Sequence, residues 1–491
     1  MYDKTTQTLK INGKLTLPFK TSKGVRQGCV LSPRLFNLFI NDIPEIFDEQ
    51  CDPVKLGTIN LQCLLYADDI VVFSETKNGL QRCMKKIEAY TEKWKMNLNR
   101  KKTKIVVFQK QGGMSKVNIQ FHGQTLEQVK QYKYLGTIIS RNGTFNINSQ
   151  YLKGKGLRAR FLVTKTIGVG CKANTIIKIF EKMVEPILLY NCEIVQMCMP
   201  KNITFEKFES RMWNSSSSID NVVYGLLRQV LSLQKKTPNL GMLAEVGKHP
   251  LCTNIYIQTM KYYVRLTSSD NILLKNALLE ATKRYQEGKI SWLKQIMFLR
   301  KTTKIDNIVE LSKNPTSFIT KFKKELYKSF EEYWQKERTK DSKLRFYFEH
   351  KREFKYEKYL DYKNRKHRTA ITKMRLSSHK FPIESMRMQN IIRENRLCPL
   401  CEDGSVGDEW HYLKKCTNRS MIDIRNIFRL EIIKVQQQFS KMDLHNILHY
   451  CLQCHDDVVI GPLGKYIYDI LEVYDLENEK QLEKDINCIM M

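Results

Sequence analysis

The sequence predicts an α+β segment over residues 1–145, followed by a longer part that is mainly α-helical. Two observations support this division. Short apolar runs bounded by turn residues recur before residue 145, whereas apolar residues spaced three and four apart dominate after it. The chain has 491 residues, of which 42% are hydrophobic, so it is long enough for about three folded domains.

The charge balance restricts the class of partner. The chain has 82 Lys and Arg against 51 Asp and Glu, a formal net charge of +31. Such an excess over a globular chain indicates a polyanion partner, most often nucleic acid, with an anionic membrane as the weaker alternative. No apolar run approaches a membrane span, and the N-terminus lacks a signal-peptide core. We therefore expect no membrane partner and a nuclear or cytoplasmic protein that is not secreted, with its 14 cysteines mostly reduced.

Within the α+β segment the elements follow in order. Ser32 and Pro33 occupy the N-cap and first positions expected of a helix. The apolar runs 61–66 and 70–73 are separated by three residues only, which predicts a tight β-hairpin. Beyond the hairpin we expect an amphipathic helix over 80–94 and strands at 105–108 and 134–139.

Two adjacent carboxylates, Asp68 and Asp69, lie at the tip of this predicted hairpin. Like charges a few ångströms apart beside apolar strands require compensation, and a divalent cation supplies it. Mg²⁺ held by carboxylates and substrate phosphates is the usual arrangement. A solvated surface turn is the alternative, because an Asp-Asp pair is common in such turns.

Neighbouring segments give the hairpin a context. An Arg-Gln-Gly turn at 26–28 and Leu-Ser-Pro at 31–33 precede it, whereas a Lys-Thr-Lys run at 102–104 and Tyr-Leu-Gly at 134–136 follow. This ordered set resembles the reverse transcriptase of non-LTR (LINE-type) retrotransposons. It is similar to the family's motif B, the metal-binding motif C hairpin, the motif D lysine and the primer-grip motif E.

The resemblance implies a role for each motif. Asp68 and Asp69 would ligate catalytic Mg²⁺ in a two-metal site. Lys102 would protonate the pyrophosphate leaving group, although its neighbours Lys101 and Lys104 compete for that role. The residues implied at the nucleotide and template pocket are Arg26, Gln27 and Gly28, and those at the primer grip are Tyr134, Leu135 and Gly136. Without the resemblance, Lys102 could equally be a solvated lysine in a basic run, and residues 134–136 could be part of an ordinary strand.

One part of the family pattern is missing. The family uses a further aspartate, in motif A, upstream of the Arg-Gln-Gly turn, and before Asp42 this sequence contains only Asp3. We therefore expect a C-terminal portion of a larger element that begins within the palm. An incomplete two-metal site would leave polymerase activity of the chain alone in doubt.

The resemblance extends beyond the palm, which would occupy 1–145. It implies a helical thumb with its extension over 146–300, in which 175–190 and 255–266 have helical periodicity. Residues 301–390 would form a basic, aromatic-rich helical linker, since 341–380 hold 13 Lys and Arg against 5 Asp and Glu. The aromatic residues of this linker either stack on unpaired RNA bases or form the core stripe of a helix with a basic outer face.

The C-terminal region, 391–491, contains a metal-binding pattern. Cys398, Cys401, His411 and Cys416 have the spacing C-x2-C-x9-H-x4-C, which predicts a closed tetrahedral Zn²⁺ site with a structural role. Members of the family often end in such a knuckle, and unrelated buried cysteines are the alternative. The later Cys451-x2-Cys454-His455 has haem-attachment spacing, but we expect packing thiols there because an export context is lacking.

Together these observations favour an RNA-directed DNA polymerase of a non-LTR retrotransposon, with Mg²⁺ and structural Zn²⁺ as cofactors. The expected partners are an RNA template, a DNA primer or target, and deoxynucleoside triphosphates. One alternative is a non-catalytic nucleic-acid-binding remnant. A second is a group II intron maturase, whose palm motifs are similar.

Overall fold

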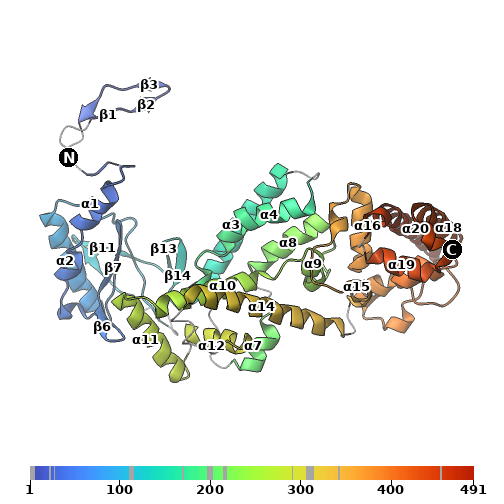
Figure 1. Ribbon diagram of the computed structural model, residues 1–491. Helices are drawn as coiled ribbons and strands as arrows, with labels where there is room; N and C mark the ends of the chain where they lie inside the picture. Colours follow the sequence, from blue (N-terminus) through green and yellow to red (C-terminus); the bar gives the residue numbers. More distant parts are fainter. Residues whose placement is uncertain are drawn as a thin grey trace. The chain divides into compact units, whose positions relative to one another are not determined.

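The computed structural model describes residues 6–20, 24–26, 28–109, 116–167, 171–195, 203–213, 218–289, 291–305, 314–340, 343–453 and 456–490. The chain divides into two compact units (Figure 1). Unit 1 comprises Met1–Thr144 and Ser269–Glu287, and unit 2 comprises Phe145–Ser268 and Gly288–Met491. Unit 1 is therefore built from two segments of chain that are far apart in sequence.

Unit 1 contains short strands that pair two by two. The pairs β1–β4, β2–β3, β5–β6, β7–β8, β10–β11 and β13–β14 are antiparallel, and β9–β12 is parallel. The strands are β1 (Thr6–Gln7), β2 (Lys10–Ile11), β3 (Lys14–Leu15), β4 (Phe19–Lys20), β5 (Val54–Leu56), β6 (Ile59–Leu61), β7 (Cys63–Tyr66), β8 (Asp69–Val72), β9 (Lys104–Ile105), β10 (Gln120–Phe121), β11 (Gln124–Thr125), β12 (Glu127–Gln128), β13 (Gln131–Tyr134) and β14 (Thr137–Ser140). Its α-helices are α1 (Ser32–Phe39), α2 (Lys77–Lys93) and α11 (Ile272–Gln286).

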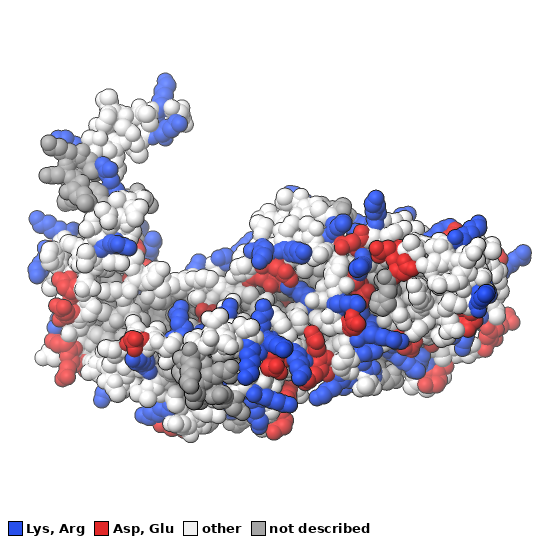
Figure 2. All heavy atoms as spheres, viewed as in Figure 1, with Lys and Arg blue, Asp and Glu red and all other residues white. Residues whose placement is uncertain are grey.

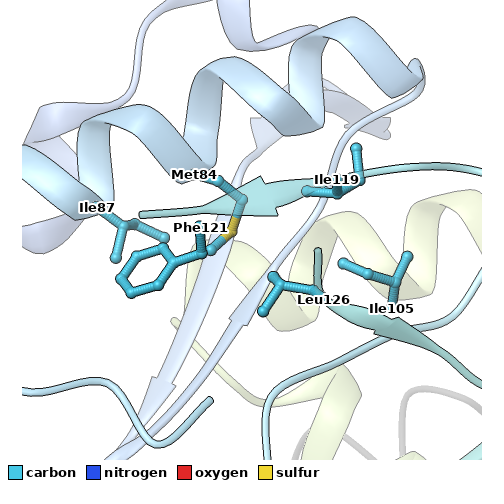
Figure 3. Close-up of a cluster of buried hydrophobic side chains, with 6 residues drawn as sticks. All are labelled: Met84, Ile87, Ile105, Ile119, Phe121 and Leu126. Carbon is cyan, nitrogen blue, oxygen red and sulfur yellow. The ribbon is translucent and has the colours of Figure 1, made fainter. Parts of the chain in front are cut away.

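The core of unit 1 lies between α2 and the strands that follow it (Figure 3). Met84 and Ile87 point from one face of the helix toward Phe121 and Leu126. The helix presents this face because its apolar residues recur every three to four positions. Thr76 caps the helix, since its side chain accepts a hydrogen bond from the main-chain N–H of Gly79 at 2.9 Å.

Unit 2 is helical. Its helices are α3 (Asn146–Ile167), α4 (Ala173–Met183), α5 (Glu185–Leu188), α6 (Cys192–Val195), α7 (Phe205–Arg211), α8 (Asp220–Leu231), α9 (Asn239–Glu245), α10 (Leu251–Thr267), α12 (Trp292–Thr302), α14 (Pro315–Arg338), α15 (Arg345–His350), α16 (Arg365–Arg375), α17 (Pro382–Ser385), α18 (Arg419–Val435), α19 (Leu444–Leu452) and α20 (Asp457–Met490). One face of α14 is fully buried, with a stripe at every fourth residue from Phe318 to Trp334. None of the helices in the described part of the chain is long and apolar enough to span a bilayer.

The predicted composition of the fold is confirmed: short strands lie in the N-terminal part, and helices dominate after it. Several element boundaries differ from the prediction. The expected strand 61–66 is interrupted at Gln62, and the expected helix 175–190 ends at Met183 and resumes at Glu185, because Pro186 cannot donate to the helical ladder. Helix α1 begins at Ser32 itself, with Leu31 rather than Ser32 in the N-cap position.

The basic stretch 341–380 is helical only in part, through α15 and α16. Its aromatic residues are mostly buried, with Tyr347 and Tyr359 fully inaccessible and Phe346 and Phe348 below one tenth exposed. Phe354 packs against Phe330 of α14, with ring centroids 5.1 Å apart. Of the two alternatives for these aromatics, the structure therefore favours core packing over base stacking.

Candidate functional site

The carboxylate pair occupies the tip of the predicted hairpin. Strands β7 and β8 pair in the register Cys63↔Val72 to Tyr66↔Asp69, so Ala67 and Asp68 form the two-residue turn. Asp68 and Asp69 are both exposed. Ala67 has a φ of 49°, a left-handed conformation that favours glycine, which indicates local backbone strain at the turn.

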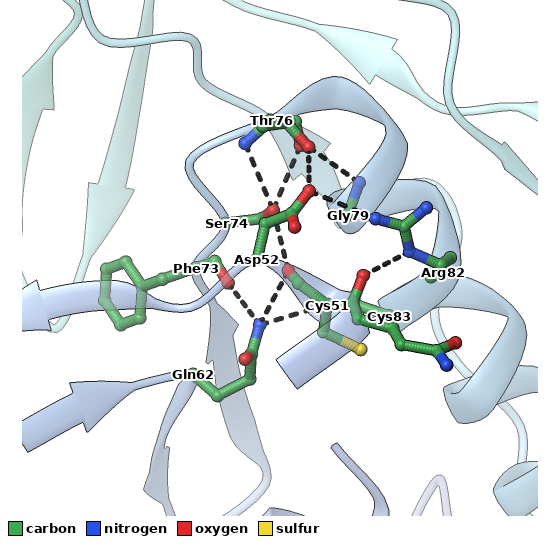
Figure 4. Close-up of polar contacts among 10 residues, drawn as sticks. Cys51, Asp52, Gln62, Phe73, Ser74, Thr76, Gly79, Arg82 and Cys83 are labelled. Atoms are coloured by element: carbon green, nitrogen blue, oxygen red, sulfur yellow. Dashed lines mark hydrogen bonds and ion pairs between the residues drawn. The ribbon is translucent and has the colours of Figure 1, made fainter. Parts of the chain in front are cut away.

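The open end of the hairpin is anchored by a polar network (Figure 4). The side-chain amide of Gln62 donates to the carbonyl of Phe73 at 2.8 Å and to that of Cys51 at 3.2 Å. The main-chain N–H of Phe73 donates back to the carbonyl of Gln62 at 2.7 Å. This network holds the base of the hairpin to the segment before β5, which positions the tip.

The same network reaches the start of α2. Asp52 accepts hydrogen bonds from the Thr76 hydroxyl and from Arg82, the latter at 3.1 Å (Figure 4). Gly79 of α2 packs closely against this network. A Cβ atom at this position would lie 2.5 Å from the Cys51 carbonyl oxygen and 2.7 Å from the Asp52 carboxylate. A side chain at this position would therefore push the helix away from the hairpin base.

The segment implied to carry motif B packs beside the hairpin through its helix. Phe36 and Ile40 of this segment contact the cluster that contains Leu65 of β7 and Ile70 of β8. Arg26 is exposed, and its carbonyl accepts a hydrogen bond from the N–H of Cys29 at 3.3 Å. Gly28 has a φ of 84° and open space around it, while Gln27 and Asp3 lie outside the described residues.

The Tyr-Leu-Gly segment forms the tight turn of the β13–β14 hairpin. Leu135 and Gly136 both have positive φ, at 43° and 82°, as a two-residue turn of the primed type requires. Burial, together with the charge of Asp69, raises the pKa of Tyr134.

The lysine loop is tied to the same hairpin. The hydroxyl of Tyr132 in β13 donates to the main-chain carbonyl of Lys102 at 3.2 Å, and the side chain of Lys102 is exposed. Lys104 forms an ion pair with Glu127 across the parallel β9–β12 pair. Of the two competing lysines of the Lys-Thr-Lys run, Lys104 is held by this ion pair, whereas Lys102 projects into solvent.

The four residues of the cysteine–histidine pattern converge in unit 2. Their candidate ligand atoms all lie within 4.8 Å of one another. The Sγ atoms of Cys398 and Cys416 are 4.0 Å apart, and Sγ of Cys401 lies 3.4 Å from Nε2 of His411. Tetrahedral zinc with Zn–S bonds of about 2.3 Å separates its ligand atoms by roughly 3.8 Å. These four side chains therefore fit a closed Zn²⁺ site.

The backbone around this cluster has the form of a knuckle. The N–H of Leu400 donates to Sγ of Cys398 at 3.4 Å, and Gly404 takes a φ of 63° in the return loop. A π-helical turn, His411–Lys415, begins at the third ligand and ends just before the fourth, Cys416, whose N–H donates to the His411 carbonyl at 2.8 Å. Hydrogen bonding from the Cys416 thiol, more than from His411 and Tyr412, lowers the pKa of Cys398. The same hydrogen bond raises the pKa of Cys416, and burial raises that of Cys401, so without a metal ion the Cys398–Cys416 pair shares one proton.

Buried carboxylates connect the knuckle to the helices before it. Glu409 accepts hydrogen bonds from Ser377 at 2.6 Å and from His379 at 3.1 Å. Although burial raises the pKa of Glu409, these hydrogen bonds hold it below its ordinary range. Arg375, two residues before Ser377, forms a two-pronged ion pair with Glu245, at 2.8 and 3.3 Å, and both side chains are fully buried. The stretch 375–379 therefore joins α9 to the knuckle.

The sequence analysis missed several of these positioning residues. Gln62 is a polar residue that interrupts an apolar run, and this interruption is the signal that could have identified it. Glu245 is a charged residue within an apolar stretch, but nothing in the sequence pairs it with Arg375, 130 positions away.

Comparison with known proteins supports a relationship to one group of polymerases. Residues 2–139 match the family described as reverse transcriptase (RNA-dependent DNA polymerase). The RNA-directed DNA polymerase from the mobile element jockey of Drosophila melanogaster is 27% identical over 186 residues, which are 35% of this chain and 19% of that protein. The probable RNA-directed DNA polymerase from transposon BS of the same species is 28% identical over 204 residues, 38% of this chain and 21% of that protein.

A third relative is the Pol polyprotein from the type-1 retrotransposable element R2 of Nasonia vitripennis, 27% identical over 150 residues, which are 29% of this chain and 14% of that protein. In each of these comparisons the chain spans about a fifth of the relative's length or less. The resemblance found in the sequence is confirmed: this protein contains a reverse transcriptase segment and is related to the polymerases of the non-LTR retrotransposons jockey, R2 and BS.

Proposed function

We propose that this chain takes part in RNA-directed DNA synthesis by a non-LTR retrotransposon, through a palm centred on the β7–β8 hairpin. In this proposal the helices of unit 2 between residues 146 and 300 serve as the thumb, and the Cys3His cluster is a structural zinc knuckle. The proposed partners are an RNA template, a DNA primer and deoxynucleoside triphosphates.

The single observation that carries the proposal concerns the β13–β14 hairpin, which holds the Tyr-Leu-Gly segment and contacts the loop of Lys102. Strand β13 has Tyr132 bonded to the Lys102 loop and Tyr134 within the field of Asp69. The contact between β13 and the lysine loop supports the proposal, because nucleotide transfer requires the proton donor and the primer end at one centre.

The residues present suit this chemistry. Asp68 and Asp69 offer exposed carboxylate oxygens, the ligands Mg²⁺ prefers, and the ion would stabilise the triphosphate and activate the attacking hydroxyl. Lys102 carries an exposed ammonium that could deliver a proton to the pyrophosphate oxygen. Tyr134 and the Leu135-Gly136 turn would orient the primer end.

Primer extension on an RNA template with Mg²⁺ tests this proposal. Incorporation by the wild-type chain should be lost in Asp68→Asn, which removes a metal-binding charge without changing size. The matched control is Asp270→Asn, which removes an exposed charge elsewhere in unit 1. Incorporation that survives Asp68→Asn unchanged would refute the assignment of the hairpin.

A second candidate function is non-catalytic binding of nucleic acid. The observation that favours it is the basic surface: Figure 2 shows Lys and Arg side chains spread over the visible face, with smaller groups of Asp and Glu among them. Template–primer binding without incorporation, at any Mg²⁺ concentration, would support this candidate over polymerisation by the chain.

A further inference from the structure

A cavity of about 230 Å³ lies in unit 2 beside the segment that carries the Cys3His cluster. It is formed by α15, α17 and the loops that lead into the knuckle. The side chains around it are strongly polar, with five cations among them. Its lining residues are Lys343, Arg345, Phe346, Glu349, Ile383, Glu384, Arg387, Arg393, Arg396, Asp408, Glu409 and Trp410.

The carboxylates of this cavity do not balance its cations. Glu384 is shared by Lys343, at 2.9 Å, and Arg387, at 3.3 Å. Asp408 pairs with Arg393 at 2.9 Å. Glu409 accepts hydrogen bonds from Ser377 and His379, and Glu349 accepts one from Trp410. The lining therefore holds five cations against four carboxylates, an excess of one positive charge.

Arg396 is the least compensated of these groups. It is 9% exposed, and its guanidinium donates to two main-chain carbonyls, those of Ile391 and Ile383, both at 2.9 Å. Within the described part of the chain, no carboxylate forms an ion pair with Arg396. The charges of Glu384 and Glu394 act on Arg396, but those of Arg387 and Arg393 oppose them. The hydrogen bonds to neutral carbonyls therefore leave a buried positive charge that is only partly compensated, which is costly. An anion in the cavity would supply the missing counter-charge.

The remaining wall is aromatic. Phe346 and Trp410 line the cavity with ring centroids 5.4 Å apart, and the indole N–H of Trp410 donates to Glu349 at 2.7 Å. The indole is therefore held in one orientation next to the cations. Trp410 and Asp408 immediately precede His411, so the position of this wall depends on the folded knuckle.

We propose that this cavity binds a phosphate group of a nucleic-acid strand through three of its lining arginines, Arg345, Arg387 and Arg396. Arginine forks match phosphate oxygens in two-pronged geometry, and a backbone phosphate adds the single negative charge that Arg396 lacks. The inference goes beyond the proposed polymerisation, because all of these residues lie in unit 2 and none belongs to the carboxylate hairpin.

The test uses the full zinc-loaded chain carrying Asp68→Asn, without Mg²⁺, so that the outcome does not depend on polymerase activity. The cavity variant is Arg345→Gln with Arg387→Gln, whose side chains are exposed or partly exposed and should not disturb folding. The matched control is Arg429→Gln with Arg419→Gln, which removes two exposed charges from α18. Thermal unfolding of each variant verifies that it folds.

Fluorescence anisotropy with a labelled 20-nucleotide single strand is the first readout. The cavity variant should bind about tenfold more weakly than the parent and show a shallower dependence on salt, whereas the control should stay within about twofold. Equal weakening in the cavity variant and the control would overturn the proposal, because it would show that only diffuse charge matters.

The second readout identifies the source of the phosphate. Inorganic phosphate at constant ionic strength should raise the melting temperature of the parent and not that of the cavity variant, since a ligand that binds only the folded state stabilises it. Stabilisation by inorganic phosphate together with unchanged strand binding in the cavity variant would assign the cavity to free phosphate and overturn the proposal of a strand site. The site would be refuted if inorganic phosphate failed to stabilise the parent and the cavity variant bound the strand as tightly as the parent does.

Discussion

The carboxylate hairpin and the Cys3His cluster are two candidate metal sites built in opposite ways. Asp68 and Asp69 stand exposed at the tip of a hairpin with two four-residue strands, and their surroundings leave them open to solvent. Cys398, His411 and Cys416 are buried, and their ligand atoms already meet around one point. The carboxylate pair is therefore accessible to solvent, whereas the ligand atoms of the Cys3His cluster face one another in the interior.

The difference follows from the chemistry of the two ions. Mg²⁺ keeps several waters and shares its remaining positions with substrate phosphates, so its carboxylate ligands must stay accessible. Structural Zn²⁺ is satisfied by four protein ligands, so its thiolates can be buried in the core of a small domain. An accessible site contributes little to folding, whereas a closed site is part of the folding free energy.

Removal of a zinc ligand should have the largest effect. Cys398→Ser should abolish zinc binding and destabilise the C-terminal region by more than about 5 kcal/mol, since structural zinc contributes its binding energy to folding. Zinc content by atomic emission should fall from about one ion per chain to none, with a parallel loss of thermal stability. Cys451→Ser, a buried cysteine outside the cluster, should keep its zinc. Equal zinc content in Cys398→Ser and Cys451→Ser would contradict the assignment of a zinc site to the Cys3His cluster.

Breaking the buried ion pair behind the knuckle should come next. Arg375→Gln leaves the carboxylate of Glu245 buried without its counter-charge, which should cost about 3–5 kcal/mol in the free energy of unfolding. Lys465→Gln, which breaks a partly exposed pair with Glu431, should cost less than about 1 kcal/mol. Urea denaturation monitored by tryptophan fluorescence measures both. Similar losses would show that burial does not distinguish these two ion pairs.

Acidification should weaken unit 2 through a buried imidazole. Burial lowers the pKa of His350 from 6.5 to about 3, although the carbonyl of Phe346 opposes this shift. The folded state therefore keeps His350 neutral while the unfolded state binds a proton, so its stabilisation is present above pH 6.5 and is lost as the pH falls. At pH 5 the loss should be about 2 kcal/mol.

Urea midpoints at pH 7 and pH 5 measure this dependence. His350→Phe should reduce the difference between the two pH values, whereas replacement of the exposed His122 by Gln should leave it unchanged. An undiminished pH dependence in His350→Phe would assign the effect to other groups.

The smallest effects should be found at the hairpin tip. Asp68→Asn should change the free energy of unfolding by less than about 0.5 kcal/mol, because the side chain is exposed. At the hairpin base, Gly79→Ala should cost about 1–3 kcal/mol, since its new methyl group would meet the Cys51 carbonyl oxygen and the Asp52 carboxylate. Thermal unfolding measures both variants: the melting temperature should fall clearly in Gly79→Ala and hardly change in Asp68→Asn.

Much of the local structure could be predicted because it depends on neighbours in the sequence. The β7–β8 hairpin follows from two apolar runs with a short turn, and the helix α2 follows from its periodic apolar face. The spacing of the four cysteine and histidine residues within 19 positions brought them into reach of one ion.

The contacts between distant segments could not be predicted. Gln62 binds the carbonyl of Phe73, Tyr132 reaches the Lys102 carbonyl, and Arg375 finds Glu245 only because separate elements pack together. A propensity or a spacing reports on residues a few positions apart, whereas these hydrogen bonds depend on the relative placement of whole strands and helices.

The sequence by itself determined the α+β-then-helical order of the chain, its basic character, the hairpin with two acids at its tip, and the knuckle spacing. Only the tertiary structure decided that the aromatics of 341–380 lie in the core, and that Arg396 is buried beside a cavity without a carboxylate partner among the described residues. The physical reason is that burial and charge compensation are properties of three-dimensional packing, which a one-dimensional pattern does not specify.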